Sequence, residues 1–257
     1  MHVPNVPIKG DVVVSIIPEE RTVEFPANRS LGELYILDQN GKTQFHGDAV
    51  GSVKVPQGAN LSLYYSFDPV YGCALLSDVI TDGIHSLSFL GSDVHDGELI
   101  HVGRLSGLKE LDISCTQVGD EGVLHLKHLK ELAKLNLSST RVTTKGIATI
   151  STMSKLRELV LDDTEIGDEA LTHIKNLTEL QILSLSFTDV TDKGLSKLKE
   201  MKNLEKLRLN CTDIGDDGLG FVGRLTNLKE LWLRSTQVSY PGLVELTKWL
   251  PNCEIII

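Results

Sequence analysis

The sequence predicts an α/β solenoid, in which short parallel strands alternate with short helices along one superhelix. Three observations favour this fold class. Apolar residues recur with a period of 24 residues, and within each period their spacing changes from that of a strand to that of a helix. The chain of 257 residues, 41% of them hydrophobic, is also long enough to bury a continuous core.

The repeat begins at Ile84, and seven copies fill residues 84–251 without an insertion. Position 1 is Ile or Leu in every copy, positions 4 and 6 are apolar, and position 11 is always Val or Ile. Position 9 is Thr in six of the seven copies. Because the phase never changes, we expect each copy to fold in the same way and to stack on the next.

Each repeat combines a strand pattern with a helix pattern. Positions 4 and 6 are two residues apart with a polar residue between them in most repeats, and this period of two predicts a short strand with one buried face. Positions 16, 19 and 22 are apolar at helical spacing, as in Leu195, Leu198 and Met201, and the Asp, Thr or Ser residues just before them can cap a helix. A single repeat could shield its apolar residues on one side only. We therefore expect stacked repeats with a parallel sheet on the concave side and helices on the convex side.

Both ends of such an array need a cover, because an open end exposes the core. Residues 252–257 place Ile255 and Ile257 at positions 4 and 6, which predicts a C-terminal capping strand. Upstream, residues 60–83 keep the same phase and are interpreted as a degenerate first repeat.

Residues 1–59 are predicted to form a small β-rich N-terminal cap. Strands are expected at Val12–Ile17, Leu31–Leu37 and Ala49–Val55, and Asn40-Gly41 is a pair typical of tight turns. The sequence leaves two roles open for this cap: it closes the solenoid, or it also carries a second binding surface.

The seven copies resemble the 24-residue leucine-rich repeat LxxLxLxxTxVxDxGLxxLxxLxx, which is common in bacteria, notably planctomycetes. The resemblance implies a right-handed leucine-rich-repeat solenoid and, because such proteins mostly bind other proteins, a recognition role. The repeats are also similar to those of eukaryotic F-box adaptors, but the first 83 residues show no three-helix pattern, so we expect no F-box. The departures from the pattern are Glu98 and Ala170 at position 15, Thr144 and Tyr240 at position 13, and Pro241 in the last helix, where it fits a first turn.

Charge and cysteine spacing exclude several classes of partner and predict a location. The net charge of −10 opposes binding to nucleic acid or an anionic membrane. No apolar run approaches the roughly 18 residues of a membrane helix, and Met1–Arg21 lack the features of a secretory signal. Cys115 and Cys211 lie four repeats apart, and Cys73 and Cys253 lie near opposite ends, so no disulfide is expected. We therefore predict a cytoplasmic protein.

Ser196–Lys199 match the catalytic motif SxxK, but no companion motif exists, and no nucleotide-binding motif occurs, so we expect a protein that is not an enzyme and has no cofactor or metal. His125 and His128 lie three residues apart with His101 in the neighbouring repeat, but no carboxylate or cysteine ligands converge there. Asp213 and Asp216 belong to an acidic cluster at a helix start, which capping explains better than calcium binding. The Thr column is interpreted as scaffold whose hydroxyls bond backbone groups.

The concave face is the predicted binding surface, because there the repeats differ from one another. If positions 4 and 6 point inward, positions 3, 5, 7 and 8 face the solvent. Aromatic and Arg residues, which are enriched at the energetic centres of interfaces, occur together in the later repeats. The predicted partner-binding residues are Val160, Asp162, Asp163, Ile182, Phe187, Arg208, Asn210, Trp232 and Arg234.

We expect this face to be polarised and to expose apolar side chains. Acidic residues occur in the early and middle repeats and basic residues in the late ones, while Val160, Ile182, Phe187 and Trp232 are expected to lie exposed among them. Variation unrelated to binding could also place single apolar residues on the sheet. The charged residues, in order, are Glu110, Asp112, Glu158, Asp162, Asp163, Lys206, Arg208 and Arg234.

The leading hypothesis is a non-enzymatic module that binds a protein or peptide on the concave sheet. One alternative is a small-ligand or enzyme-associated module with a pocket between the N-terminal cap and the first repeats, where Glu110 and Asp112 are the nearest titratable groups. Another alternative is a purely structural spacer. The sequence decides neither the partner nor the oligomeric state.

Overall fold

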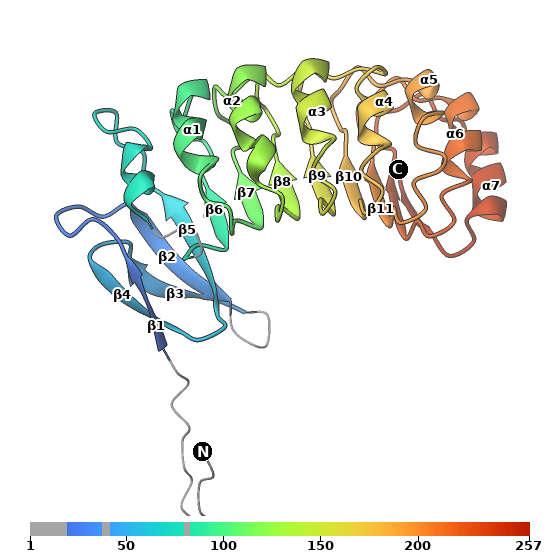
Figure 1. The fold of residues 1–257 in the computed structure, drawn as a ribbon. Coiled ribbons are helices and arrows are strands. Elements are labelled where there is room, and N and C mark those ends of the chain that lie inside the picture. Colours follow the sequence, from blue (N-terminus) through green and yellow to red (C-terminus); the bar gives the residue numbers. More distant parts are fainter. Residues whose placement is uncertain (1–19, 38–41, 80–82) are drawn as a thin grey trace, which may run out of the picture.

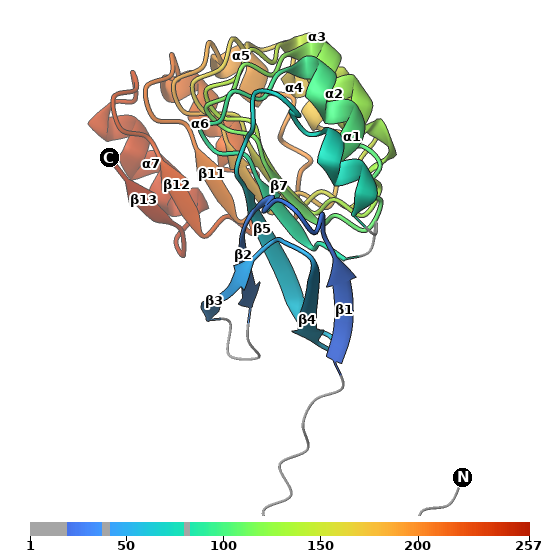
Figure 2. The same cartoon turned by 90° about the vertical axis from the view of Figure 1, so that its left-hand side faces the viewer.

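The computed structural model describes residues 20–37, 42–79 and 83–257, and it confirms the predicted α/β leucine-rich-repeat solenoid. Figure 1 shows the strands stacked side by side, each followed by a short helix. Figure 2, a view from the N-terminal end, shows the helices on one side of the sheet. The expected strand Val12–Ile17 and the expected turn at Asn40-Gly41 lie outside the described residues.

A single large sheet runs through the described part of the chain in the order β13-β12-β11-β10-β9-β8-β7-β6-β5-β2-β3. From β5 to β13 neighbouring strands are parallel, and paired residues are one repeat apart, as Leu159, Leu183 and Leu207 are. The repeat strands are β6 (Ser86–Ser88), β7 (Glu110–Asp112), β8 (Lys134–Asn136), β9 (Glu158–Val160), β10 (Ile182–Ser184), β11 (Lys206–Arg208), β12 (Glu230–Trp232) and β13 (Glu254–Ile256).

The N-terminal strands prolong this sheet. β5 (Asn60–Tyr65) pairs in parallel with β6 and antiparallel with β2 (Gly32–Leu37), which in turn pairs with β3 (Thr43–Asp48). β1 (Glu20–Glu24) and β4 (Ser52–Pro56) form a separate antiparallel pair. The solvent face of the repeat strands therefore continues without a break onto β5, β2 and β3.

The α-helices are short, from four residues in α1 to ten in α7. Pro241 lies in the first turn of α7, as predicted. The α-helices are α1 (Leu99–Val102), α2 (Asp120–His125), α3 (Thr144–Ile150), α4 (Leu171–Ile174), α5 (Asp192–Leu195), α6 (Asp216–Val222) and α7 (Tyr240–Trp249), and the 3₁₀ helices are η1 (Ala74–Asp78), η2 (Asp96–Glu98) and η3 (Leu126–His128).

The apolar columns of the repeat form one continuous core. In all seven repeats the residues at positions 1, 4 and 6 are buried. The Thr column makes the predicted backbone bonds, because each hydroxyl donates to the carbonyl of position 6, as Thr140 does to Leu137 at 2.6 Å. These bonds satisfy carbonyl groups at the point where the chain leaves the strand.

A left-handed residue follows every repeat strand from β6 to β12. Position 8 has a φ between 52° and 67° in all seven repeats, from Gly91 to Ser235. In the first six repeats its N–H donates to the position 7 carbonyl of the next repeat, as Phe187 does to Asn210 at 2.8 Å. The left-handed conformation suits Gly but costs other residues about 1–2 kcal/mol. Position 8 therefore lies at a sharp turn beyond the strand.

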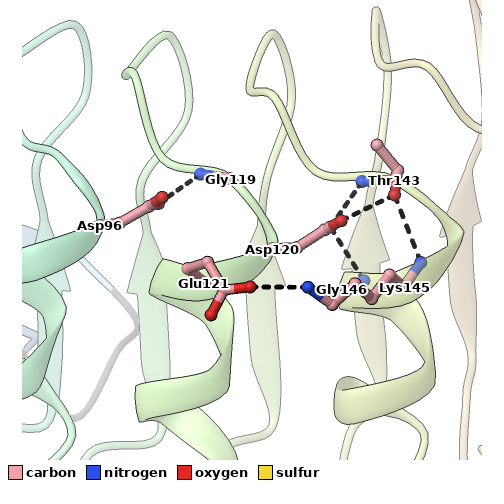
Figure 3. Close-up of polar contacts among 7 residues, drawn as sticks. All are labelled: Asp96, Gly119, Asp120, Glu121, Thr143, Lys145 and Gly146. Carbon is pink, nitrogen blue, oxygen red and sulfur yellow. Dashed lines mark hydrogen bonds and ion pairs between the residues drawn. The ribbon is translucent and has the colours of Figure 1, made fainter.

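Aspartates at position 13 bond five of the repeats to the next one, and Figure 3 shows two of these aspartates, Asp96 and Asp120. Asp120 accepts hydrogen bonds from the N–H groups of Thr143 and Gly146, at 2.8 and 2.9 Å, and from the Thr143 hydroxyl. Thr143 also caps its own helix, as predicted, because its hydroxyl accepts from Lys145 N–H. The aspartates were expected to cap their own helices, but their carboxylates bond the start of the following one. The other four are Asp96, Asp168, Asp192 and Asp216.

The glycines at position 15 leave room for these carboxylates. A Cβ atom on Gly242 would lie 2.2 Å from Oδ1 of Asp216, and the three nearest atoms all belong to that side chain. Ala170 departs from the glycine pattern, and the repeat before it has Thr144 instead of Asp. The two departures therefore have one cause: position 13 and position 15 of the next repeat share one space.

The first repeat fills the same space from the other side. Position 13 of the preceding block is Gly72, and position 15 of the first repeat is Glu98. The Glu98 carboxylate reaches back and accepts a hydrogen bond from Cys73 N–H at 2.7 Å. A Cβ atom on Gly72 would lie 2.3 Å from this carboxylate, so Gly and the acid have exchanged positions.

The C-terminal strand covers the last repeat only in part. β13 pairs in parallel with β12, where Ile255 lies beside Leu231 and is half-buried. Ile257, however, is 68% exposed, so the prediction that it fills an inward position 6 is wrong.

We expect Gly242→Ala to lower the free energy of unfolding by about 1 kcal/mol, because the new Cβ displaces the Asp216 carboxylate from Ser239. In an Asp216→Ala background the same change should be neutral or stabilising, because Ala favours a helix over Gly. Urea denaturation of the wild type, the two single variants and the double variant measures the coupling free energy between the two positions.

Gly220→Ala is the matched control. Gly220 lies inside α6, and a Cβ atom there would have no atom within 4 Å. This substitution should stabilise the protein by about 0.5–1 kcal/mol. If the changes in unfolding free energy of Gly242→Ala and Asp216→Ala were strictly additive, the two positions would not share one space.

Introducing the missing position 13 carboxylate at Thr144 should require two changes. Thr144→Asp alone is expected to add no stability, because its carboxylate would compete with the Cβ of Ala170. Thr144→Asp with Ala170→Gly should show a favourable coupling of about 1 kcal/mol, since the new carboxylate can accept from Gly167 N–H. Denaturant unfolding of the single and double variants measures this coupling, and a single variant as stable as the double would refute it.

Candidate functional site

The concave face consists of the side chains at positions 3, 5 and 7 of the repeat strands and their continuation on β5, β2 and β3. Strand pairing aligns equal positions of neighbouring repeats. Position 5 forms a row across the sheet in which Val160, Ser184, Arg208 and Trp232 follow one another. At about 4.8 Å per strand, this row spans roughly 14 Å.

Trp232 packs with two arginines on this face, Arg208 and Arg234, and the three residues are named the Trp232 cluster. The guanidinium carbons of Arg208 and Arg234 lie 5.5 and 5.9 Å from the centroid of the indole ring, within the range of cation–π interactions. The indole Nε1 is buried, and no acceptor among the described residues meets both the distance and the angle of a hydrogen bond with it. The pKa of the nearby Glu230 carboxyl is lowered, chiefly by its hydrogen bond with Lys206 and in smaller part by Trp232.

Only one of the four apolar site residues is as exposed as predicted. Phe187 is 60% exposed, whereas Val160, Ile182 and Trp232 are half-buried. The prediction of four exposed residues was wrong for the three on strands, because neighbouring side chains on adjacent strands cover each other. Ile182, for example, lies between Glu158 and Lys206.

Phe187 and Asp163 occupy the left-handed position 8, so they lie where the chain leaves the sheet. Asp163 accepts a hydrogen bond from the hydroxyl of Ser139, the position 8 residue of the preceding repeat, at 2.8 Å. Position 8 therefore forms its own row at one edge of the concave face, apart from the Trp232 cluster.

Asp162 and Asn210, both at position 7, hold the next repeat. Oδ1 of Asp162 accepts from the Ser184 hydroxyl at 2.6 Å and from Ser186 N–H at 2.8 Å. Oδ1 of Asn210 accepts from Arg234 N–H at 2.9 Å. These two residues therefore have a structural function in addition to any contact with a partner.

The predicted polarisation of the face is weaker than expected. Lys134 lies 2.8 Å from Glu110, and Lys206 lies 2.6 Å from Glu230, so acidic and basic residues pair along position 3. The hydrogen bond with Glu110 raises the pKa of Lys134. The prediction of a polarised face took Glu110 and Lys206 without these partners. The charged site residues outside the ion pairs of the described residues are Asp112, Glu158, Asp162, Asp163, Arg208 and Arg234.

A hollow of about 350 Å³ lies on the N-terminal half of the concave face, between β5 and β9. It adjoins Glu110 and Asp112, where the alternative hypothesis expected a pocket. Two exposed residues that line it, Tyr64 and Leu90, are not among the predicted site residues. Leu90 could have been found as an apolar residue at the solvent-facing position 7 of the first repeat, and Tyr64 by extending the repeat phase upstream to position 5 of the preceding block. The remaining lining residues are Ser86, Ser88, Leu111, Lys134, Leu135, Asn136, Glu158 and Val160.

The described residues contain no group of three His, Cys, Asp or Glu side chains able to hold a metal ion. The four cysteines are free, as their spacing predicted. Burial raises the pKa of the Cys73 thiol to about 12 and that of Cys253 to about 11, which opposes nucleophilic reactivity. In the described ranges, no helix has the length and apolar character needed to cross a membrane.

Comparison with known proteins identifies the class that this fold defines. The family model for the leucine-rich repeat matches residues 108–127, 176–199 and 200–222, so the chain contains leucine-rich repeats. A search of curated proteins gave no match.

Two internalins of Listeria monocytogenes strain 4b F2365 have similar solved structures. The internalin inlF has a TM-score of 0.59 and 21% sequence identity, covering 68% of this chain and 48% of its own. The internalin C2, inlC2, has a TM-score of 0.51 and 24% identity, covering 70% of this chain and 84% of its own. The chain thus spans about half the length of inlF. Both similarities show the fold.

We expect Asp162→Asn to preserve stability, because its Oδ1 can still accept from Ser184 and Ser186, as Asn210 does from the next repeat. Asp162→Ala should lower the free energy of unfolding by about 1–3 kcal/mol, since Ser186 N–H loses its acceptor. Urea denaturation distinguishes the two variants. Equal losses would mean that the charge of Asp162 matters, and not its hydrogen bonds.

Proposed function

We propose that the protein is a non-enzymatic module that binds a protein or peptide on its concave sheet, between repeats 4 and 7. The leucine-rich repeats support a protein-binding scaffold role in general, and the concave face is where these repeats differ from one another. The proposed contact residues are Val160, Asp162, Asp163, Ile182, Phe187, Arg208, Asn210, Trp232 and Arg234.

The stacking of Arg208 and Arg234 against Trp232 is the observation that carries this proposal. Trp and Arg are the residue types that contribute most at interface centres. Here two adjacent strands hold them in contact before any partner arrives, which reduces the entropy lost on binding. A partner carboxylate against the guanidinium groups and an apolar side chain over the indole would match this cluster.

Phe187 supports the same surface by a different argument. Its left-handed backbone, with a φ of 58°, costs about 1–2 kcal/mol for a residue other than Gly. Because its ring is exposed, folding gains little apolar burial in return. A contact with a partner would explain why a large apolar residue occupies this position.

A small-ligand or enzyme-associated role is the alternative. The hollow beside Glu110 and Asp112 favours it by its position, but Lys134 pairs with Glu110, and Ser114 donates two hydrogen bonds to Asp112. We propose no cofactor or metal. The net charge of −10 disfavours nucleic acid and anionic membranes as partners. A bacterial origin and a cytoplasmic location stay predictions.

Trp232→Ala and Arg208→Ala should each weaken binding of the physiological partner at least tenfold, or by about 1.4 kcal/mol. The reason is that each variant removes one side of the Trp–Arg contact. The partner would be identified by pull-down with the full chain, and the affinity of the purified pair measured by isothermal titration calorimetry.

Arg224→Ala is the control, because Arg224 is exposed in the turn after α6, away from positions 3, 5 and 7. It should leave the affinity unchanged, and thermal melts should show that all three variants fold. Affinity unchanged in both Trp232→Ala and Arg208→Ala would remove the proposed site.

A further inference from the structure

The concave face carries a second apolar area at its N-terminal end. Tyr35 on β2 lies between Phe45 on β3 and Tyr64 on β5, with ring centroids 5.5 and 5.1 Å apart in edge-to-face geometry. Phe45 is 61% exposed and Tyr64 is 50% exposed. Together with Leu90, also 61% exposed, these residues are named the N-terminal apolar patch.

Strand pairing places this patch on the concave face. Tyr35 lies opposite Phe45, and Tyr64 lies opposite Ser88 of β6, which lines the hollow. Residues directly opposite each other on paired strands point to the same side of a sheet. Tyr64 and Leu90 belong both to the patch and to the lining of the hollow, so the two features form one continuous surface.

The charge of this surface is negative. Three carboxylates and one ammonium group line the hollow, an excess of two negative charges. Lys134 forms an ion pair with Glu110 and also attracts the more distant carboxylate of Glu158, while neither Asp112 nor Glu158 belongs to an ion pair of the described residues. Glu33 adds a further carboxylate beside Tyr35, whose hydroxyl donates to it at 2.8 Å.

We propose that the N-terminal apolar patch and the adjoining hollow bind an exposed polypeptide segment in which Lys or Arg stands next to Phe, Leu or a similar apolar residue. The inference rests on the proposed function, because it uses the same sheet, and it assigns partner chemistry to the half of the sheet that the Trp232 cluster leaves free. The cationic group lies between Asp112 and Glu158, and the apolar side chain covers Tyr64 and Leu90.

The chemistry of the surface selects this partner over others. An acidic segment would bring its carboxylates against Asp112, Glu158 and Glu33. A purely apolar ligand would remove water from Asp112 and Glu158 without providing a countercharge. A Lys or Arg side chain supplies that charge and is also attracted to the ring faces of tyrosines. An apolar neighbour then fills the exposed surface of the patch.

The chain itself provides conservative variants. Asp112→Asn is expected to preserve the fold, because Asn136 in the next repeat accepts the same two hydrogen bonds from Ser138 that Asp112 accepts from Ser114. Tyr64→Ser places at position 5 the residue that Ser88 supplies one strand further on.

The test uses three fluorescein-labelled synthetic peptides of twelve residues and fluorescence anisotropy on the full chain. The first alternates Arg with Phe and Leu, the second has Glu in place of each Arg, and the third has Ser in place of each apolar residue. We expect the first to bind at least tenfold more tightly than the others. Asp112→Asn with Glu158→Gln, and separately Tyr64→Ser, should each weaken its binding at least fivefold, and the double variant should reduce the salt dependence.

The charge-matched control is Glu121→Gln with Glu169→Gln, which removes two exposed carboxylates on the helix side of the same two repeats. It should leave binding of the first peptide unchanged. Equal binding of the acidic peptide, or equal effects of the two double variants, would overturn the inference.

Trp232→Ala separates this inference from the proposed function. If the peptide loses affinity with Asp112→Asn/Glu158→Gln and keeps it with Trp232→Ala, the N-terminal surface is supported independently of the Trp232 site. If only Trp232→Ala weakens binding, the inference is overturned while the proposed function stands.

Discussion

The hydrogen bonds between each position 13 carboxylate and the next repeat determine how this solenoid stacks. One Asp120 side chain satisfies two backbone N–H groups and one hydroxyl of its neighbour, which would otherwise lie unpaired near a helix start. The carboxylate reaches these groups only where the next repeat lacks a Cβ at position 15, as at Gly146. The interaction thus joins two sequence positions that belong to different repeats.

Because the core and these position 13 hydrogen bonds on the helix side determine how repeats stack, the side chains of the concave face are free to vary. The position 7 acceptors Asp162 and Asn210 bond to the backbone of the next repeat, and either amide or carboxylate oxygen serves. At position 5, Asp112 and Asn136 accept a backbone hydrogen bond only from position 7 of their own repeat. The helix side of each repeat is therefore constant, while the surface of the sheet differs from strand to strand.

The sequence predicted the fold and the row containing Arg208 and Trp232, because a constant 24-residue phase converts spacing directly into neighbours. It did not predict how β2 and β3 join the sheet, since their antiparallel pairing follows no repeat. It also missed the half-burial of Ile182, which depends on the lengths of the side chains around it. The ion pair between Lys206 and Glu230 was readable from the phase, had position 3 been compared across all repeats.

The join between the cap and the repeats has a consequence for function. A cap whose strands turned away would end the concave face at β6, whereas β5 continues it through parallel pairing and β2 through antiparallel pairing. The surface therefore extends from the aromatic rings around Tyr35 to the indole of Trp232, with carboxylates near one end and guanidinium groups near the other. An extended partner that contacts both ends must carry the opposite order of charge, so the orientation in which it lies along the sheet follows from electrostatics.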